Sequence, residues 1–344
     1  MSIQSIAHVE FHCADADRFA AYLVEAYAFA LEPPVTAEPG VRRVWVRQGT
    51  IRFLLSSADQ PTHPVAEFVA RHGDGVAVFA LGCADPAAAL DQALRNGARP
   101  LAPGLVAGFG DVALRFVALP EPLPEPHPQP LPEPQPGAIP EGSAAELLQF
   151  LDHAALCVPA GELPDAVKFC EQALGFRRIF DEYIEVGAQA MDSSVVQSPS
   201  GLVTFTLIQP DTARSPGQID TFLDRHEGSG VQHLAFHTGD IAVAVRELTR
   251  RGVRFLSTPE TYYQALPERI GATNVPVETL RELNVLVDQD HGGQLYQIFT
   301  RSAHDRRTFF LELIERQGAG TFGSANIRAL YEAVERQHAT SPAN

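Results

Sequence analysis

Cysteine is scarce in this sequence, and no two cysteines are close enough to form a short motif. The four, Cys13, Cys83, Cys157 and Cys170, are widely spaced along 344 residues, without a Cys-x-x-Cys pair. This spacing argues against a disulfide framework and against a thiolate zinc site. We therefore expect reduced thiols and a cytoplasmic protein.

Clustered positive charge and long apolar runs are also missing. The formal net charge is -16 and no Lys/Arg cluster occurs, which argues against nucleic acid and anionic membrane surfaces as partners. No stretch approaches the roughly 18 uninterrupted apolar residues of a membrane-spanning helix, and the N-terminus lacks a basic region followed by an apolar run. The sequence thus predicts a protein that is neither exported nor membrane-spanning.

Proline, by contrast, is concentrated in one segment. It occurs ten times between Leu119 and Pro140, mostly at every second position. Because proline lacks a backbone donor and favours an extended conformation, we interpret this segment as a semi-rigid spacer. With 45% hydrophobic residues, the chain can bury a full core. We predict two domains, residues 1–118 and 143–344, joined by a linker at 119–142.

The two halves of the chain resemble each other. The matching runs are 6–13 with 151–157, and 73–80 with 228–235. Each run reads as a strand that leads into a helical stretch, so four similar units start near residues 5, 74, 150 and 230. Hairpin signals follow the first and third helices. This pattern predicts an α+β fold in which paired units curl their sheets around a cavity.

A carboxylate interrupts an apolar strand near the C-terminus. Glu312 would share one strand face with Phe310 and Ile314. A lone carboxylate on such a dry face costs several kcal/mol unless it is paired or holds a metal. The candidate partners are His153 and His233, which lie in strand-like runs of equivalent units. Two imidazoles and one carboxylate form the facial triad of non-haem Fe(II) sites, although zinc accepts the same ligands.

The repeat supplies an internal control for this triad. The first half has His8 where the second has His153, but it has Val78 where the second has His233. Its closing strand has no carboxylate to match Glu312. We therefore expect a metal-free structural domain in the first half and the metal site in the second.

Longer ordered motifs carry a family resemblance. The runs 230–235, 288–300, 310–316 and 322–332 resemble the 4-hydroxyphenylpyruvate dioxygenase family. The resemblance covers residues 150–337 and, more loosely, the first half. It implies the vicinal-oxygen-chelate fold with four βαβββ modules in two domains, and Fe(II) as the cofactor. The implied iron ligands are His153, His233 and Glu312.

The resemblance also implies the reaction. The substrates would be 4-hydroxyphenylpyruvate, bound to iron through the two oxygens of its 2-oxoacid group, and O2. Loss of CO2 accompanies hydroxylation, either at the ring, which gives homogentisate, or at the benzylic carbon, which gives 4-hydroxymandelate. The pocket that orients the substrate decides between the two products.

Pocket positions favour the benzylic outcome. The implied substrate-binding residues are Ser193, Thr206, Ile208, Gln218, Gln232, Gln297, Phe322, Ile327 and Tyr331. Homogentisate-forming dioxygenases have Asn where this chain has Ile208, and Phe where it has Ile327 and Tyr331. With Thr206, these residues resemble the 4-hydroxymandelate synthase branch of the family, whereas Gln209 departs from both branches.

Several alternatives stay open at this point. The chain is also compatible with a homogentisate-forming dioxygenase and with a non-catalytic small-molecule-binding protein of the same fold. The sequence leaves room for a homo-oligomer. The glycine-rich run 318–323 is typical of either a hinge before a lid helix or a turn that ends a strand.

Overall fold

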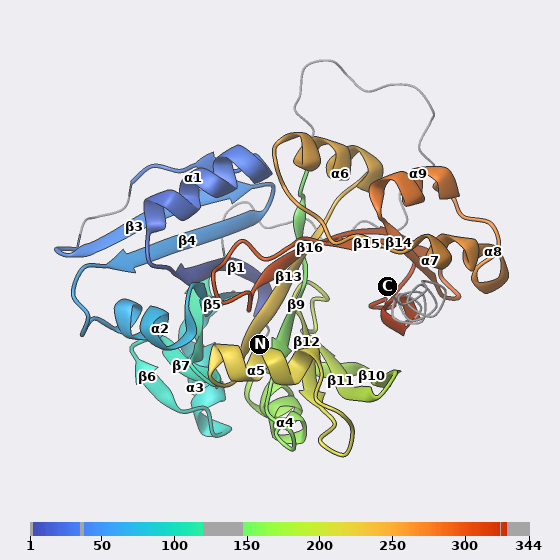
Figure 1. The fold of residues 1–344 in the computed structure, drawn as a ribbon. Helices are drawn as coiled ribbons and strands as arrows, with labels where there is room; N and C mark the ends of the chain where they lie inside the picture. Colours follow the sequence, from blue (N-terminus) through green and yellow to red (C-terminus); the bar gives the residue numbers. More distant parts are fainter. Residues whose placement is uncertain (1–2, 35–37, 120–146, 324, 329–344) are drawn as a thin grey trace.

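Two sheets with the same internal order form the frame of the molecule (Figure 1). The structure is a computed structural model that describes residues 3–34, 38–119, 147–323 and 325–328. The N-terminal sheet has the strand order β2-β3-β4-β1-β5-β8-β7-β6, and the C-terminal sheet has the order β10-β11-β12-β9-β13-β16-β15-β14. Each strand of the first sheet therefore has a counterpart at the same place in the second.

The elements follow one another in the same way in both halves. The N-terminal half contains β1 (Ile3–His12), α1 (Ala16–Tyr27), β2 (Ala30–Leu31), β3 (Val41–Gln48), β4 (Ile51–Ala58), α2 (Pro64–His72), β5 (Gly75–Cys83), α3 (Pro86–Arg95), β6 (Pro100–Ala102), β7 (Leu105–Phe109) and β8 (Val112–Ala118). The C-terminal half contains β9 (Phe150–Cys157), α4 (Leu163–Ala173), β10 (Arg177–Val186), β11 (Gln189–Gln197), β12 (Thr204–Pro210), α5 (Gln218–His226), β13 (Gly230–His237), α6 (Ile241–Arg250), α7 (Glu260–Gln264), α8 (Leu266–Arg269), α9 (Val277–Leu283), β14 (Leu286–Gln289), β15 (Gln294–Phe299) and β16 (Phe310–Gln317).

Strand pairing confirms the predicted repeat and the α+β class. In the first sheet β1 is parallel to β4 and antiparallel to β5, which is parallel to β8. In the second, β9, β12, β13 and β16 pair in the same directions. The four units begin with β1, β5, β9 and β13, close to the predicted starts. Nearly all of the predicted linker lies outside the described residues, and the domain boundaries remain predictions.

The turn after the first strand of three units starts a helix in the same way. Asp15, Asp85 and Asp240 precede α1, α3 and α6, and each side chain accepts a hydrogen bond from a backbone N–H in the first helical turn. This cap satisfies a donor that the helix itself cannot pair. The short Asp-containing turns of the sequence thus fix where these helices begin.

One hydrophobic core continues from the first sheet to the second. Phe79 of β5 and Phe205 of β12 are fully buried, and their ring centroids are 5.1 Å apart. Phe53 of β4 and Phe236 of β13 form a second contact at 6.0 Å. Aromatic pairs of this kind stabilise beyond the area that they bury. The two halves are therefore held together by apolar side chains from the centre of each sheet.

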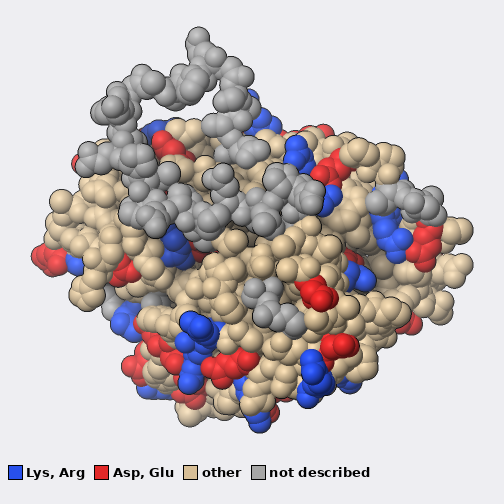
Figure 2. Space-filling view, turned by 180° about the vertical axis from the view of Figure 1, so that it is seen from behind, with Lys and Arg blue, Asp and Glu red and all other residues tan. Residues whose placement is uncertain are grey.

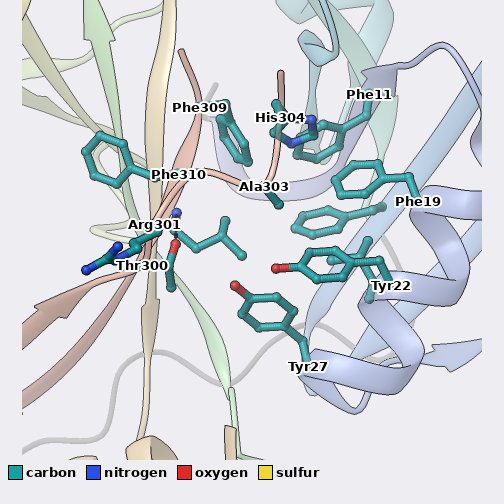
Figure 3. Close-up of a pocket in the computed structure, with 13 residues that line it drawn as sticks. Phe11, Phe19, Tyr22, Tyr27, Thr300, Arg301, Ala303, His304, Phe309 and Phe310 are labelled. Atoms are coloured by element: carbon teal, nitrogen blue, oxygen red, sulfur yellow. Dashed lines mark hydrogen bonds between the residues drawn. The ribbon is translucent and has the colours of Figure 1, made fainter. Parts of the chain in front are cut away.

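A small apolar cavity lies at this junction, between α1 and the segment 300–311 (Figure 3). Its volume is about 20 Å³, which is room for a single water molecule. Tyr22 and Tyr27 face it from α1, whereas the ring of Phe310 lies on the other side of its strand. Phe310 instead stacks on His233, with ring centroids 5.0 Å apart. A cavity of this size cannot hold an aromatic ring, so it does not serve as a site for an aromatic ligand.

The surface carries charges of both signs. On the face shown in Figure 2, basic and acidic side chains alternate among uncharged ones over the described residues. Within the described part of the chain, none of the helices combines the length and the apolarity needed to cross a bilayer.

Candidate metal centre

Three adjacent strands in the middle of the C-terminal sheet bring the predicted triad together. His153 lies on β9, His233 on β13 and Glu312 on β16. Ala235 of β13 is directly opposite His153 on one side and Glu312 on the other. Because Ala235 carries only a methyl group, the side chains of its two neighbours can converge above it.

The distances between the three side chains suit one shared ion. Glu312 Oε2 lies 3.5 Å from His153 Nε2 and 3.3 Å from His233 Nε2. One ligand atom from each residue lies within 4.8 Å of the other two. Donors about 2.1 Å from an ion, and at right angles to one another, would be about 3 Å apart. The geometry and the N,N,O donor set therefore fit a divalent ion in a facial triad.

All three side chains are buried, and burial affects the protonation of His233. His153, His233 and Glu312 are 4%, 9% and 2% exposed. Burial lowers the pKa of His233, and the nearby Glu312 only partly opposes this effect. His233 is thus held as the neutral imidazole that metal binding requires. Its Nδ1 is buried and has no hydrogen-bond partner among the described residues.

His153 has a carboxylate partner that the sequence-based prediction missed. Its Nδ1 lies 2.8 Å from Asp152 Oδ1, and Asp152 also accepts two hydrogen bonds from Arg316, at 2.7 and 2.9 Å. Burial raises the pKa of the Asp152 carboxyl, but the Arg316 guanidinium outweighs it and holds that pKa well below its usual range. The one feature of the sequence that points to Asp152 is its position directly before the candidate ligand His153.

Buried, mostly apolar side chains continue from the triad along the same face of the sheet, and we call this surface the apolar wall. Ala155 and Cys157 follow His153 at alternate positions on β9 and therefore share its face. Thr206 lies opposite Ala155, and Ile208 lies opposite Cys157. Cys157 and Ile208 belong to one buried cluster, which also contains Ala155, Ile184, Val186, Met191, Ile219 and Phe222. Ile327, from the helical residues 325–328, packs against this cluster.

Two predicted pocket residues of this wall carry polar groups. Ser193 is next to Ile208 on the neighbouring strand β11 and is buried. Thr206 is buried as well, and its Oγ1 has no hydrogen-bond partner among the described residues. A buried hydroxyl without a partner is costly, so Thr206 is available to a ligand or to an ordered water on this face, and its role in substrate binding stays a prediction.

The predicted glutamines occupy different environments. Gln232 is the extra residue of a β-bulge in β13, directly before His233, and it is buried. Gln297 of β15 is 1% exposed, and its side-chain oxygen accepts a hydrogen bond from Asn326 at 3.3 Å. Gln218, in contrast, is the exposed first residue of α5. The structure therefore groups Gln232 and Gln297 with the buried polar side chains, but not Gln218.

The glycine-rich run behaves as a turn that is fixed in place. Asp290 accepts hydrogen bonds from the backbone N–H groups of Gly320 and Thr321, at 2.7 and 3.0 Å. Gly318 has a φ of +89°, and its α-carbon packs against the backbone of Gly292 without space for a side chain. Phe322 then lies edge-on to His153, at a ring-centroid distance of 5.5 Å. Tyr331 is outside the described residues.

The equivalent position in the N-terminal half holds an ion pair instead of a triad. Ala80 is the counterpart of Ala235, and it lies opposite His8 on β1 and Arg115 on β8. Arg115 Nε donates to Glu10 at 2.7 Å, and His8 Nε2 lies 3.4 Å from the same carboxylate. Arg115 therefore occupies the place of Glu312, in a strand where the sequence has no matching carboxylate.

A duplicated sheet that curls around two imidazoles and one carboxylate defines a metal-dependent enzyme of the vicinal-oxygen-chelate class. Residues 152–270 match the model of the glyoxalase, bleomycin resistance protein and dioxygenase superfamily. The chain is 30% identical to a 4-hydroxyphenylpyruvate dioxygenase of Coccidioides posadasii, over 96% of this chain and 92% of the relative. It is 32% identical to the Caenorhabditis elegans protein of the same name, over 84% and 80%.

A solved structure is similar over the whole chain. It is a triply substituted variant of 4-hydroxymandelate synthase from Streptomyces coelicolor, 41% identical, with a TM-score of 0.81 and coverage of 97% of this chain and 99% of that one. The chain belongs to the 4-hydroxyphenylpyruvate dioxygenase family. It is accordingly an iron-dependent dioxygenase of the 2-oxoacid type.

Replacing Glu312 by Ala should abolish iron retention, because the triad loses its only anionic ligand. Metal analysis of the protein purified after iron loading measures this directly. The control is Glu171→Ala, which removes an exposed carboxylate from α4. Iron in the Glu312 variant at the level of the control would remove Glu312 from the ligand set.

The Glu10 ion pair should make stability depend on pH. Burial raises the pKa of Glu10, but hydrogen bonds from His8 and Arg115 outweigh it and lower that pKa to about 2. A depressed pKa stabilises the fold above the unfolded-state value, about 4.5, and this contribution is lost as the pH falls towards 2. Glu10→Gln should therefore cost about 2–3 kcal/mol at pH 7 and progressively less below pH 4.5.

Urea unfolding of the wild type and Glu10→Gln across this pH range measures the difference between their free energies of unfolding. Glu171→Gln should show almost no difference from the wild type at any pH, since surface changes of this kind are small. If the difference in free energy of unfolding between the wild type and Glu10→Gln stays constant down to pH 2, Glu10 does not have the lowered pKa that we assign to it.

Proposed function

We propose that this protein is a 4-hydroxymandelate synthase, which converts 4-hydroxyphenylpyruvate and O2 to 4-hydroxymandelate and CO2. The observation that carries the proposal is the apolar wall beside the triad, with Ile208 at its centre and Ile327 packed against it. The higher identity to the solved synthase than to the curated dioxygenases supports the same choice.

The atoms of this reaction balance without a further reactant. The carboxyl carbon of the substrate leaves as CO2, and one oxygen atom of O2 enters the carboxylate that forms at the former keto carbon. The other oxygen atom is inserted into a benzylic C–H bond, whose hydrogen ends on the new hydroxyl. Ferrous iron held by His153, His233 and Glu312 would supply the activation of O2, with the electrons coming from the 2-oxoacid.

The protein's own contribution is to hold the substrate and to exclude water. The triad brings only one carboxylate to the metal, so an anionic 2-oxoacid can bind the same ion. Thr206 lies opposite Ala155, which follows His153 by two residues on β9 and lies opposite His233, so the wall begins directly beside two of the ligands. An aromatic ring lying against this wall meets Ile208, which offers bulk and no hydrogen bond. The position of the substrate ring relative to the metal is then determined by its packing against the wall.

Ile208 is the residue that we expect to control the product. An Asn at this position adds a hydrogen-bonding group on the substrate side and removes a branched apolar side chain. A ring that turns towards this amide would present its ring carbons, in place of its benzylic carbon, to the metal. By the family resemblance described above, homogentisate-forming dioxygenases are expected to have Asn at this position.

Iron-loaded protein incubated with 4-hydroxyphenylpyruvate in air should release CO2 and form 4-hydroxymandelate, identified by chromatography and mass spectrometry. Homogentisate as the main product would assign the chain to the alternative dioxygenase activity. Absence of CO2 release under these conditions would instead favour a binding protein of the same fold.

Ile208→Asn combined with Tyr331→Phe should shift the product ratio towards ring-hydroxylated compounds. The matched control is Ile208→Leu, which keeps an apolar side chain of equal volume and should keep 4-hydroxymandelate as the product. Chromatography of both reaction mixtures gives the ratio. The same ratio in the double variant and in the wild type would contradict the role of the wall.

A further inference from the structure

Asp152 reaches the metal centre because of a bulge in β9. His153 lies opposite Ala235, whereas Leu151 lies opposite Phe236, so Asp152 is the extra residue between two pairs. Successive strand residues ordinarily point to opposite faces, and a bulge removes this alternation locally. Asp152 can therefore lie beside His153 and contact its Nδ1 at 2.8 Å.

Arg316 connects this carboxylate to the turn that follows β16. Its guanidinium donates two hydrogen bonds to Asp152, and it also donates to the backbone carbonyls of Ala319 and Thr321. The same group lies over the ring of Phe322, 5.0 Å from the ring centroid. Phe322 in turn contacts His153 edge-on. One arginine thus holds both the partner of a ligand and the aromatic residue beside that ligand.

The N-terminal half shows what the same frame looks like without this pair. Its first strand has a bulge at the matching place, between Ile6 and His8, and the bulged residue there is Ala7. Counting from the counterparts Arg115 and Glu312, the residue that matches Arg316 is Leu119. Both members of the pair are therefore absent from the half that has no triad. A role in folding the repeat alone would not explain this difference.

We propose that Asp152 and Arg316 are positioning residues that fix the orientation of His153 towards the metal and the placement of Phe322 over the site. This inference rests on the proposed metal centre. Asp152 accepts the Nδ1 hydrogen of His153, which leaves the Nε2 lone pair directed at the ion. Arg316 holds Asp152 in place with two parallel hydrogen bonds, a geometry that a lysine cannot reproduce.

The decisive variant is the double substitution Asp152→Ala with Arg316→Leu, which copies the Ala7 and Leu119 of the N-terminal half. Removing both charges avoids an unpaired buried ion, so the variant should fold. Its affinity for Fe(II) or Co(II), measured by chelator competition, should be 10–100-fold lower than that of the wild type. The absorption spectrum of bound Co(II) should also change, because the His153 ring is no longer fixed. A matched control is Arg246→Leu with Glu282→Ala, which removes an exposed ion pair between α6 and α9.

A second variant covers the case in which the double variant does not fold. Arg316→Lys keeps a positive charge near Asp152 but loses the paired hydrogen bonds. We expect it to bind metal with an affinity between those of the wild type and the double variant. We also expect a larger rise in KM than fall in kcat, because the turn that carries Phe322 loses its anchor.

The outcomes separate this inference from the proposed function. If the wild type and Glu312→Ala bind Co(II) equally, the metal centre itself is wrong. If the wild type binds Co(II) and Glu312→Ala does not, and a folded double variant or Arg316→Lys matches the wild type in affinity and in Co(II) spectrum, the positioning role is wrong. Unchanged metal binding in the exposed-pair control, together with weakened binding in the other two, supports the proposal.

Discussion

A carboxylate buried inside an apolar sheet is the constraint on which the rest of this structure depends. Glu312 is 2% exposed on a strand of apolar residues, and its nearest charged or polar partners are two imidazoles from the adjacent strands. Burial lowers the pKa of His233 and so favours its neutral form, which does not compensate the carboxylate. A divalent ion shared by all three side chains supplies positive charge and is bound by the lone pairs of both imidazoles. The small Ala235 at the centre of the three strands lets them converge on it.

The duplicated frame shows how one backbone supports two kinds of polar group. In both halves an alanine at the same register separates a histidine from a charged residue on the closing strand. In the C-terminal half the charged residue is Glu312, whereas in the N-terminal half it is Arg115, which pairs with Glu10. In the N-terminal half the carboxylate is compensated by an arginine of the protein itself. In the C-terminal half the carboxylate would be compensated by a bound metal ion. Fold alone therefore does not decide the function of a unit; the side chains at three register positions do.

Much of this arrangement could be predicted from the sequence, because alternation and repetition are visible there. The four units, the three candidate ligands and the lack of a triad in the first half all follow from residue patterns that the strand registers reproduce. Asp152 could not be found in this way, since strict alternation places it on the face opposite His153, and only a bulge brings the two together. Arg316 was missed because its partner Asp152 reaches this face of the sheet only through the same bulge. Gln218, expected in the pocket, is instead the exposed first residue of α5.

Strand pairing also places the apolar wall beside the triad, where it would determine which product forms. Ile208 and Thr206 are placed by parallel pairing of β12 with β9, so the strand that supplies one ligand also supports the surface on which the substrate ring would lie. The central claim remains that His153, His233 and Glu312 bind a single ferrous ion. X-ray absorption of the iron-loaded protein at the iron edge tests this most directly. The account predicts oxygen and nitrogen neighbours at about 2.1 Å, with the outer scattering of two imidazole rings. A spectrum without imidazole scattering, or with sulfur neighbours, would contradict it.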